Sequence, residues 1–302
     1  MGESMRAISH LLIGKGLKLW GGLAVLLSLA SPSMAQSVPS QPQPACQVAV
    51  PAKTAIYYVN GVTTTLDEAR LNGGKLELEF LGKLPGLSQS LKSKCYEFFL
   101  NYNPTSGEVK DFTEAGQQAL GLNPADMWRQ LEGAAAFSVS LVSVLQGPMT
   151  DANQVDQAAI QRHGLAYRSK MAQPGNSCRV LVVPHSQGNL YTNAAYDVAV
   201  AAPAPPAGAL KIVSVASPAT VVKGGGLHRN SSGDLLIKAI DLLPFVSTLP
   251  ANTSWTNPLT SFVSLYSGGH SYIGYLSHEP SRTDILNDIE SSLTALESVV
   301  CP

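Results

Sequence analysis

The stretch RVLVVPHSQGNLYTNAAY, residues 179–196, joins an apolar run directly to a pattern typical of a helix. The aliphatic run predicts a buried strand, and it ends at Pro184, whose fixed φ is compatible with a strand end. The helical pattern starts after Gly188. The corner between them would hold the Ser186 hydroxyl outward for chemistry, or Ser186 would only cap the helix.

Four more segments have the composition of strands, at 55–61, 95–104, 210–217 and 235–241. Thr65 and Glu68 have the spacing of a helix-opening capping box, and a helical pattern runs over 284–299. Strands that are apolar along their length and separated by helices indicate a parallel sheet covered on both faces. The predicted fold class is therefore α/β, with a mostly parallel central sheet and helices on both faces.

The chain between the second and third predicted strands has helical character. Asn123 and Pro124 have the pattern of a helix start, and Gly147 that of a stop. The helix predicted between them could pack on the sheet or cover an active site. We therefore expect a helical insertion, with a possible cap over residues 105–175.

The first residues have the pattern of a secretory signal peptide: basic residues, the apolar run WGGLAVLLSLA, then small residues before Gln36. The apolar run is shorter than the roughly 20 residues that a membrane anchor needs. We expect export to the periplasm or the extracellular space, cleavage near Ala35 and no stable membrane span. Residues 36–50 form a predicted flexible tether, and residues 51–302 the predicted folded domain.

The four cysteines, Cys46, Cys95, Cys178 and Cys301, form no C-x-x-C pair. An even number in an exported chain predicts two disulfides, with three possible connectivities, and buried free thiols are the alternative.

Charge and motif content exclude several kinds of partner. The formal net charge is −1 and no basic block is present, so we expect no nucleic-acid partner. The glycines at 224–226 lack the strand and the Lys-Ser/Thr continuation of a phosphate-binding loop. Histidines and carboxylates show no metal-ligand spacing, so no metal or other cofactor is expected. No feature indicates an oligomeric state.

The strand–PHSQG–helix pattern resembles the nucleophile elbow of the α/β-hydrolases, a superfamily of serine hydrolases that includes esterases, lipases and thioesterases. The resemblance implies the chain order nucleophile, acid, histidine, which Ser186, Asp241 and His270 follow. It also implies oxyanion-hole N–H groups from Gln187 and from the Gly61–Val62 turn.

Other residues compete for two of these roles. Asp234 precedes the predicted strand that Asp241 ends, and the carboxyl ends of parallel strands form the active edge of a sheet, which favours Asp241. His163, His228 and His278 are alternatives to His270, but each lies in a predicted helix, in an upstream loop or too near the last helix. His185 is expected to pack or to orient a neighbour.

The expected activity is cleavage of a small-molecule or lipid ester through a Ser-His-Asp triad, as in a carboxylesterase or lipase. A phospholipase or a thioesterase of the same fold is the alternative enzyme. A catalytically silent α/β-hydrolase fold used for binding is the alternative from another class.

Overall fold

The computed structural model describes residues 53–61, 64–84, 94–103, 157–173, 178–234, 237–238, 248–254 and 270–301. All of them belong to one unit of the chain, Gln43–Pro302. The predicted leader, the tether to residue 50 and residues 105–156 of the possible cap lie outside the described residues.

A parallel sheet of five strands lies at the centre of this unit. The strands are β1 (Thr54–Val59), β2 (Tyr96–Asn101), β3 (Arg179–Pro184), β4 (Leu210–Val215) and β5 (Leu227–Arg229). Their order across the sheet is β2-β1-β3-β4-β5, and every neighbouring pair is parallel. The first four predicted strands are confirmed, and so is the α/β class.

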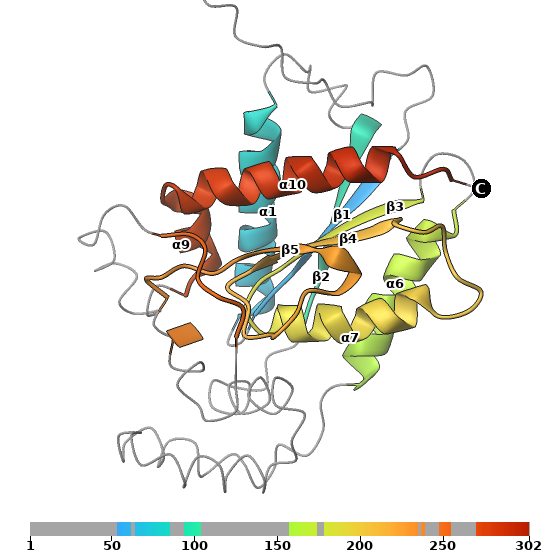
Figure 1. Ribbon diagram of the computed structural model, residues 1–302, viewed down its shortest axis with the longest axis horizontal. Coiled ribbons are helices and arrows are strands. Elements are labelled where there is room, and N and C mark those ends of the chain that lie inside the picture. The colour runs from blue at the N-terminus through green and yellow to red at the C-terminus, as the bar shows by residue number, and fades with distance from the viewer. Residues whose placement is uncertain are drawn as a thin grey trace, which may run out of the picture. The chain divides into compact units, whose positions relative to one another are not determined.

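Helices cover both faces of the sheet (Figure 1). One face packs against α1 (Leu66–Lys83), α9 (Tyr272–Ser277) and α10 (Ser281–Glu297), and the other against α6 (Gln157–Met171) and α7 (Gly188–Val200). Successive residues of a strand point to opposite faces, and in β1 they enter the two cores in turn, Ile56 and Tyr58 on one side and Tyr57 and Val59 on the other. Both faces are therefore buried, which explains the unbroken apolar runs.

The predicted helix start at Thr65 is confirmed. Thr65 is the N-cap of α1, its side chain accepts from the Glu68 amide, and the Glu68 carboxylate accepts from the Thr65 amide at 2.8 Å. This reciprocal pair satisfies two amides that a helix start otherwise leaves without partners.

The predicted fifth strand at 235–241 is wrong where the structure describes it. Ile237 and Lys238 are helical, and the fifth strand is instead β5, only three residues long. A short apolar run fits a helix as well as a strand, and β5 is too short and too exposed to show a strand pattern.

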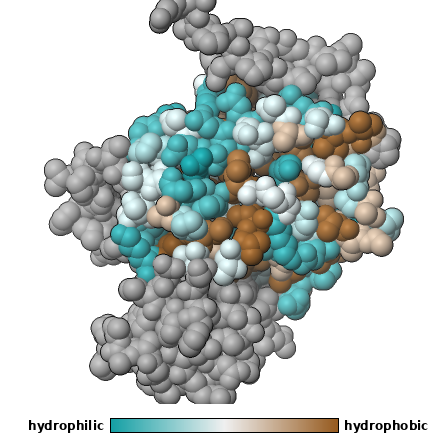
Figure 2. Space-filling model, viewed as in Figure 1, coloured by the Kyte–Doolittle hydropathy of each residue, from teal (hydrophilic) through white to brown (hydrophobic). Residues whose placement is uncertain are grey.

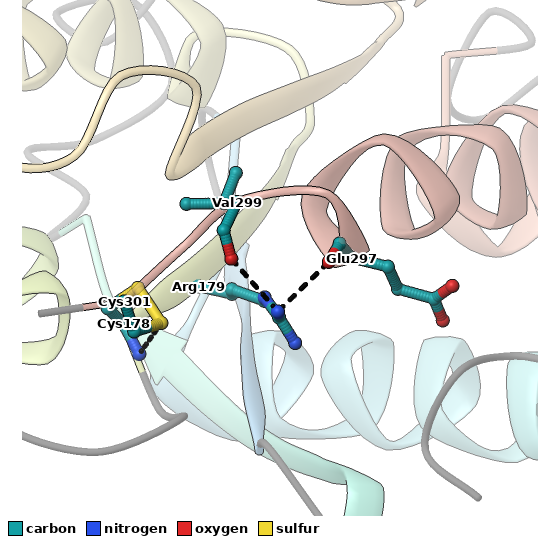
Figure 3. The surroundings of a disulfide bond; sticks show 5 residues. All are labelled: Cys178, Arg179, Glu297, Val299 and Cys301. Atoms are coloured by element: carbon teal, nitrogen blue, oxygen red, sulfur yellow. Dashed lines mark hydrogen bonds between the residues drawn. A yellow bond between two sulfur atoms is a disulfide. The ribbon is translucent and has the colours of Figure 1, made fainter. Parts of the chain in front are cut away.

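A disulfide closes the chain between the start of β3 and the C-terminal end. Cys178 and Cys301 are bonded across 123 residues of sequence (Figure 3). Cys95 is also disulfide-bonded. Beside the bridge, Nη2 of Arg179 donates to the carbonyl oxygens of Glu297 and Val299, both at 3.0 Å. The guanidinium thus satisfies carbonyls at the end of α10, and closing so long a loop stabilises the fold by about 4–5 kcal/mol in the chain-entropy model.

The surface of the face that carries α10 is mixed. Hydrophilic residues prevail over the first half of α10, with hydrophobic residues in smaller groups (Figure 2). Across the described ranges, no helix combines the length and the apolar composition that a membrane crossing requires.

The strand order creates one point at which consecutive connections leave the sheet in opposite directions. β2 follows β1 on one side, whereas β3 lies on the other side of β1. The carboxyl edge at such a switch point is where open α/β sheets bind ligands. Here that edge carries Gly61 after β1 and Ser186 after β3.

Candidate active site

Ser186 sits in a strained turn between β3 and α7. Its φ is 55°, in the left-handed region that residues other than glycine rarely adopt. The turn is tied to its neighbours, because the Ser186 amide donates to Val215 O at 3.1 Å and the Gly188 amide to His185 O at 2.9 Å. The sharp corner expected from the sequence is confirmed, with Pro184 as the last residue of β3.

Two glycines let backbone approach this turn closely. A Cβ on Gly61 would lie 2.4 Å from Ser186 Cβ and 3.0 Å from Ser186 Oγ. A Cβ on Gly188 would lie 2.7 Å from Asn60 O and 2.8 Å from Val59 O, both backbone atoms. The first turn of α7 therefore packs against the end of β1 only because residue 188 has no side chain.

We predict that Gly188→Ala destabilises the protein by about 1–3 kcal/mol, since the methyl group has to displace backbone at the end of β1. Gly74→Ala is the matched control, because Gly74 lies at an exposed position of α1 and a Cβ there meets nothing within 4 Å. It should stabilise by about 0.5–1 kcal/mol through helix propensity. Urea unfolding of both variants measures the difference, and a Gly188→Ala protein as stable as the wild type would contradict this account of the corner.

Three side chains form a hydrogen-bonded chain at the corner. His270 Nε2 lies 2.6 Å from Ser186 Oγ, and His270 Nδ1 lies 2.8 Å from Asp234 Oδ2. A carboxylate only accepts, so Nδ1 carries the proton and the Nε2 lone pair faces the serine hydroxyl. All three residues are buried. The arrangement can take the proton of Ser186 as its oxygen attacks an electrophile.

Asp234 is fully buried and still ionised. Burial by itself would raise its pKa, but the charge and the hydrogen bond of His270, with bonds from the Ile237 amide and the Tyr275 hydroxyl, hold the pKa of Asp234 below its ordinary value. The hydrogen bond from the Ile237 amide to Oδ1 is 3.1 Å long, and the hydrogen bond from the Tyr275 hydroxyl to Oδ2 is 2.9 Å long. Three donors thus replace the water that the carboxylate has lost.

The acid beside His270 is therefore Asp234, whereas the sequence pattern favours Asp241. Asp241 lies outside the described residues. The preference for Asp241 depends on a predicted strand that ends at residue 241. The fifth strand of the sheet is instead β5, which ends at Arg229, and Asp234 lies five residues after that end. Asp234 thus satisfies the rule that favoured Asp241, because it follows the carboxyl end of a parallel strand.

The loop that carries Asp234 is fixed from several directions. Asn230 Oδ1 accepts from the Ser217 amide at 2.6 Å, and Asn230 Nδ2 donates to Ser217 O and Leu249 O. Just before it, the Arg229 guanidinium forms two 2.6 Å hydrogen bonds with the Asp288 carboxylate of α10. These contacts attach the loop to the segment that follows β4, to Leu249 and, through Arg229, to α10.

His185 contacts His270 through one hydrogen bond and through its ring. Its Nε2 lies 2.7 Å from His270 O, so Nε2 carries the proton, and the two rings are 5.1 Å apart. Complete burial, followed by the nearby charge of His270, lowers the pKa of His185 to about 3. His185 is therefore neutral at pH values well above 3, in line with the expected packing or orienting role.

We predict that the free energy of unfolding falls as the pH drops below about 6.5. Between that pH and about 3 the unfolded chain binds a proton at residue 185 that the folded protein does not, which costs up to about 1.4 kcal/mol per pH unit. The stability due to the lowered pKa of Asp234 is lost only at more acidic pH. The lowered pKa values of Glu79, Glu97 and Glu279 add to this loss as the pH nears 4.5. The part due to His185 is therefore the difference between the wild type and a variant without this histidine when urea unfolding is compared at pH 6.5 and pH 4.5.

His185→Gln keeps a donor for the His270 carbonyl but does not titrate. The free energy of unfolding of this variant should therefore fall less steeply with decreasing pH, by up to about 1.4 kcal/mol per pH unit. The matched control is His228→Gln, which removes a partly exposed ring whose Nε2 lies 3.1 Å from Pro250 O. The control should keep the wild-type slope. Equal slopes in the wild type and His185→Gln would refute the prediction.

Two of the three residues expected at an oxyanion hole, Gln187 and Gly61, lie at the same edge. Gln187 follows Ser186 as the N-cap of α7, Gly61 faces Ser186, and Val62 lies outside the described residues. Gln187 is held by its side chain, since Asn103 Nδ2 lies 3.2 Å from Gln187 Oε1.

Several asparagines and one tyrosine of the site were missed in the sequence. The Asn60 side chain accepts a hydrogen bond from the Asn103 backbone amide and donates one to the Asn103 carbonyl, both at 2.8 Å, and so joins the ends of β1 and β2. Asn189 Nδ2 bonds Ser186 O and Val215 O. Asn60-Gly61 and Asn103-Pro104 signalled turns, but nothing local in the sequence shows that these side chains or Tyr275 meet.

The three alternative histidines lie elsewhere. His163 is in α6 with Nε2 3.3 Å from Tyr102 O, His228 is in β5, and His278 ends α9. No group of three His, Cys, Asp or Glu side chains within the described ranges is placed to hold a metal ion.

Comparison with known proteins finds no family model that matches the chain, and neither the curated proteins nor the solved structures include a match.

Proposed function

We propose that the protein is a serine hydrolase of the α/β-hydrolase type that cleaves an ester-type bond through an acyl-enzyme. The observation that carries the proposal is the unbroken chain from Ser186 Oγ through His270 to Asp234, at 2.6 and 2.8 Å. It is supported by the left-handed turn at Ser186, which a residue that only caps a helix does not need.

In this proposal each residue has one role. Ser186 attacks the carbonyl carbon, and His270 accepts the hydroxyl proton and then delivers it to the leaving group. Asp234 keeps the Nδ1 proton of His270 in place and stabilises the imidazolium that forms. The Gln187 amide and an amide of the 61–62 segment bind the oxyanion, the role expected from the resemblance.

The substrate class in the proposal is a carboxylic ester of a small molecule or a lipid, as for a carboxylesterase or lipase. Export belongs to the same proposal, and it is supported by the basic-apolar-small pattern of residues 1–35 and by the disulfide of Cys178 with Cys301. N-terminal sequencing of protein recovered from outside the cytoplasm tests cleavage after Ala35.

The decisive experiment is labelling with a fluorophosphonate probe, which reacts only with an activated serine. We expect one label per chain, found by peptide mass spectrometry on Ser186 and lost in Ser186→Ala. Ser298→Ala is the matched control, because that hydroxyl is exposed and donates a hydrogen bond to Ala295 O in its own helical turn. Failure of the folded wild type to react would instead favour the catalytically silent binding fold. A series of chromogenic esters of increasing chain length then defines the acyl preference.

A further inference from the structure

Tyr275 contributes a buried phenol to the site from α9. Its side chain is fully buried, and its hydroxyl oxygen lies 2.8 Å from the Ser231 amide and 2.9 Å from Asp234 Oδ2. Ser231 belongs to the same loop as Asp234, so the phenol touches both the acid and the backbone that carries it.

The direction of the phenol proton follows from these partners. The Ser231 amide can only donate, so the phenol oxygen accepts there and its own proton points to Asp234. Burial and the neighbouring carboxylate raise the pKa of Tyr275 well above its ordinary value, so the proton stays on the phenol. Tyr275 is therefore a fixed donor to the carboxylate.

The oxygen that receives this donor is also the one that His270 uses. Oδ2 of Asp234 accepts from both His270 Nδ1 and Tyr275, whereas Oδ1 accepts from the Ile237 amide. A second donor on Oδ2 withdraws charge from the bond to His270 and prevents rotation of the carboxylate.

We propose that Tyr275 is a positioning residue of the Ser186–His270–Asp234 system, which sets the strength and direction of the Asp234 bond to His270. The inference rests on the proposed function. In the described part of the chain, the titratable groups that contact Asp234 or His270 are Tyr275 from α9 and His185 from the end of β3, whereas the Tyr272 ring of α9 packs on His185.

Tyr272 provides a matched control in the same helix. It is as deeply buried as Tyr275, and its ring packs 4.7 Å from the Tyr58 ring, but no described residue hydrogen-bonds its hydroxyl. Tyr272→Phe thus removes an equally buried phenol oxygen without touching Asp234, whereas Tyr275→Phe removes the donor to Oδ2.

The experiment compares kcat, KM and the pH profile of kcat/KM in wild type, Tyr275→Phe and Tyr272→Phe. Tyr275→Phe should lose roughly 10- to 100-fold in kcat with little change in KM, because the Asp234 carboxylate is no longer fixed in line with His270 Nδ1. That size of loss is typical of one hydrogen bond to a charged group. The acid limb of its kcat/KM profile should move to higher pH by about 0.5–1 unit, because a carboxylate with fewer donors stabilises the imidazolium more. Tyr272→Phe should match the wild type in kcat, in KM and in the pH profile of kcat/KM.

A second readout does not depend on turnover. The Nδ1 proton of His270 should give a downfield proton resonance in the wild type, and Tyr275→Phe should shift it further downfield as the bond to Asp234 strengthens. If Tyr275→Phe does not fold, ring-fluorinated tyrosine placed at residue 275 keeps both hydrogen bonds but is a stronger donor. It should move the acid limb in the opposite direction, to lower pH.

The outcomes separate this inference from the proposed function. A wild type that the fluorophosphonate probe does not label on Ser186 overturns the proposed function. Normal labelling with superimposable pH profiles and resonances for Tyr275→Phe and Tyr272→Phe overturns only the role of Tyr275. A fluorinated variant with an unshifted acid limb does the same.

Discussion

Replacing Ser186 with alanine should lower kcat by about 10⁵- to 10⁶-fold while the protein stays folded. The substitution removes only the hydroxyl group, which is the proposed nucleophile and whose oxygen lies 2.6 Å from His270 Nε2. Alanine accepts the left-handed φ of 55° no worse than serine does, so the turn itself should persist. Ester hydrolysis by wild type and variant, with urea unfolding of both, makes the measurement.

Ser214→Ala is a stringent control for this change. Ser214 is a buried serine of β4 whose hydroxyl bonds Asn189 Oδ1 at 2.5 Å, close to the same turn but outside the chain to His270. It should lose stability rather than chemistry. Ester turnover that persists in Ser186→Ala at a tenth or more of the wild-type rate would end the assignment of the nucleophile.

Replacing Asp234 with asparagine should lower kcat by roughly 10⁴-fold. The amide has one acceptor and one donor end, while three donors surround the carboxylate. If the amide nitrogen takes the place of Oδ2, its N–H group faces the donors of His270 and Tyr275. It then favours the His270 tautomer that carries its proton on Nε2, which cannot accept the serine proton. With the nitrogen at Oδ1, it faces the Ile237 amide instead. Either orientation leaves donor against donor.

Asp241→Asn is the variant to compare with it, because the sequence pattern favoured that residue. The structure leads us to expect that the Asp234→Asn loss in kcat is far the larger of the two. Steady-state kinetics of both variants on one ester are sufficient. A larger loss in Asp241→Asn would return the acid to residue 241 and remove the functional basis for the phenol of Tyr275.

Much of the scaffold could be predicted because its signals are local. A strand buried on both faces must be apolar at every position, which identified β1 and β3 from AIYYV and RVLVV. The capping pair Thr65 and Glu68 needs only four consecutive residues. The turn at Ser186 needs a small residue two positions later, and Gly188 supplies it.

The choice of the acid was decided by tertiary structure alone. The run LLIKAI is compatible with a helix or a strand, and β5 has three half-exposed residues that show neither pattern. β5 exists because Val213, Ser214 and Val215 of β4 pair with it, and because Arg229 is held by Asp288 of α10. The β4 partners lie 14 residues away in the sequence and Asp288 lies 59 residues away, beyond the reach of any local pattern.

The sequence by itself therefore determined the α/β class, four of the strands and the corner that presents Ser186, because each depends on residues that are close together in the chain. Only the tertiary structure decided that Asp234 is the carboxylate at His270 and that Tyr275 bonds it. A charge without access to water is stable only where several donors converge, and the Ile237 amide, His270 and Tyr275 meet around Asp234 only once the sheet and helices have assembled.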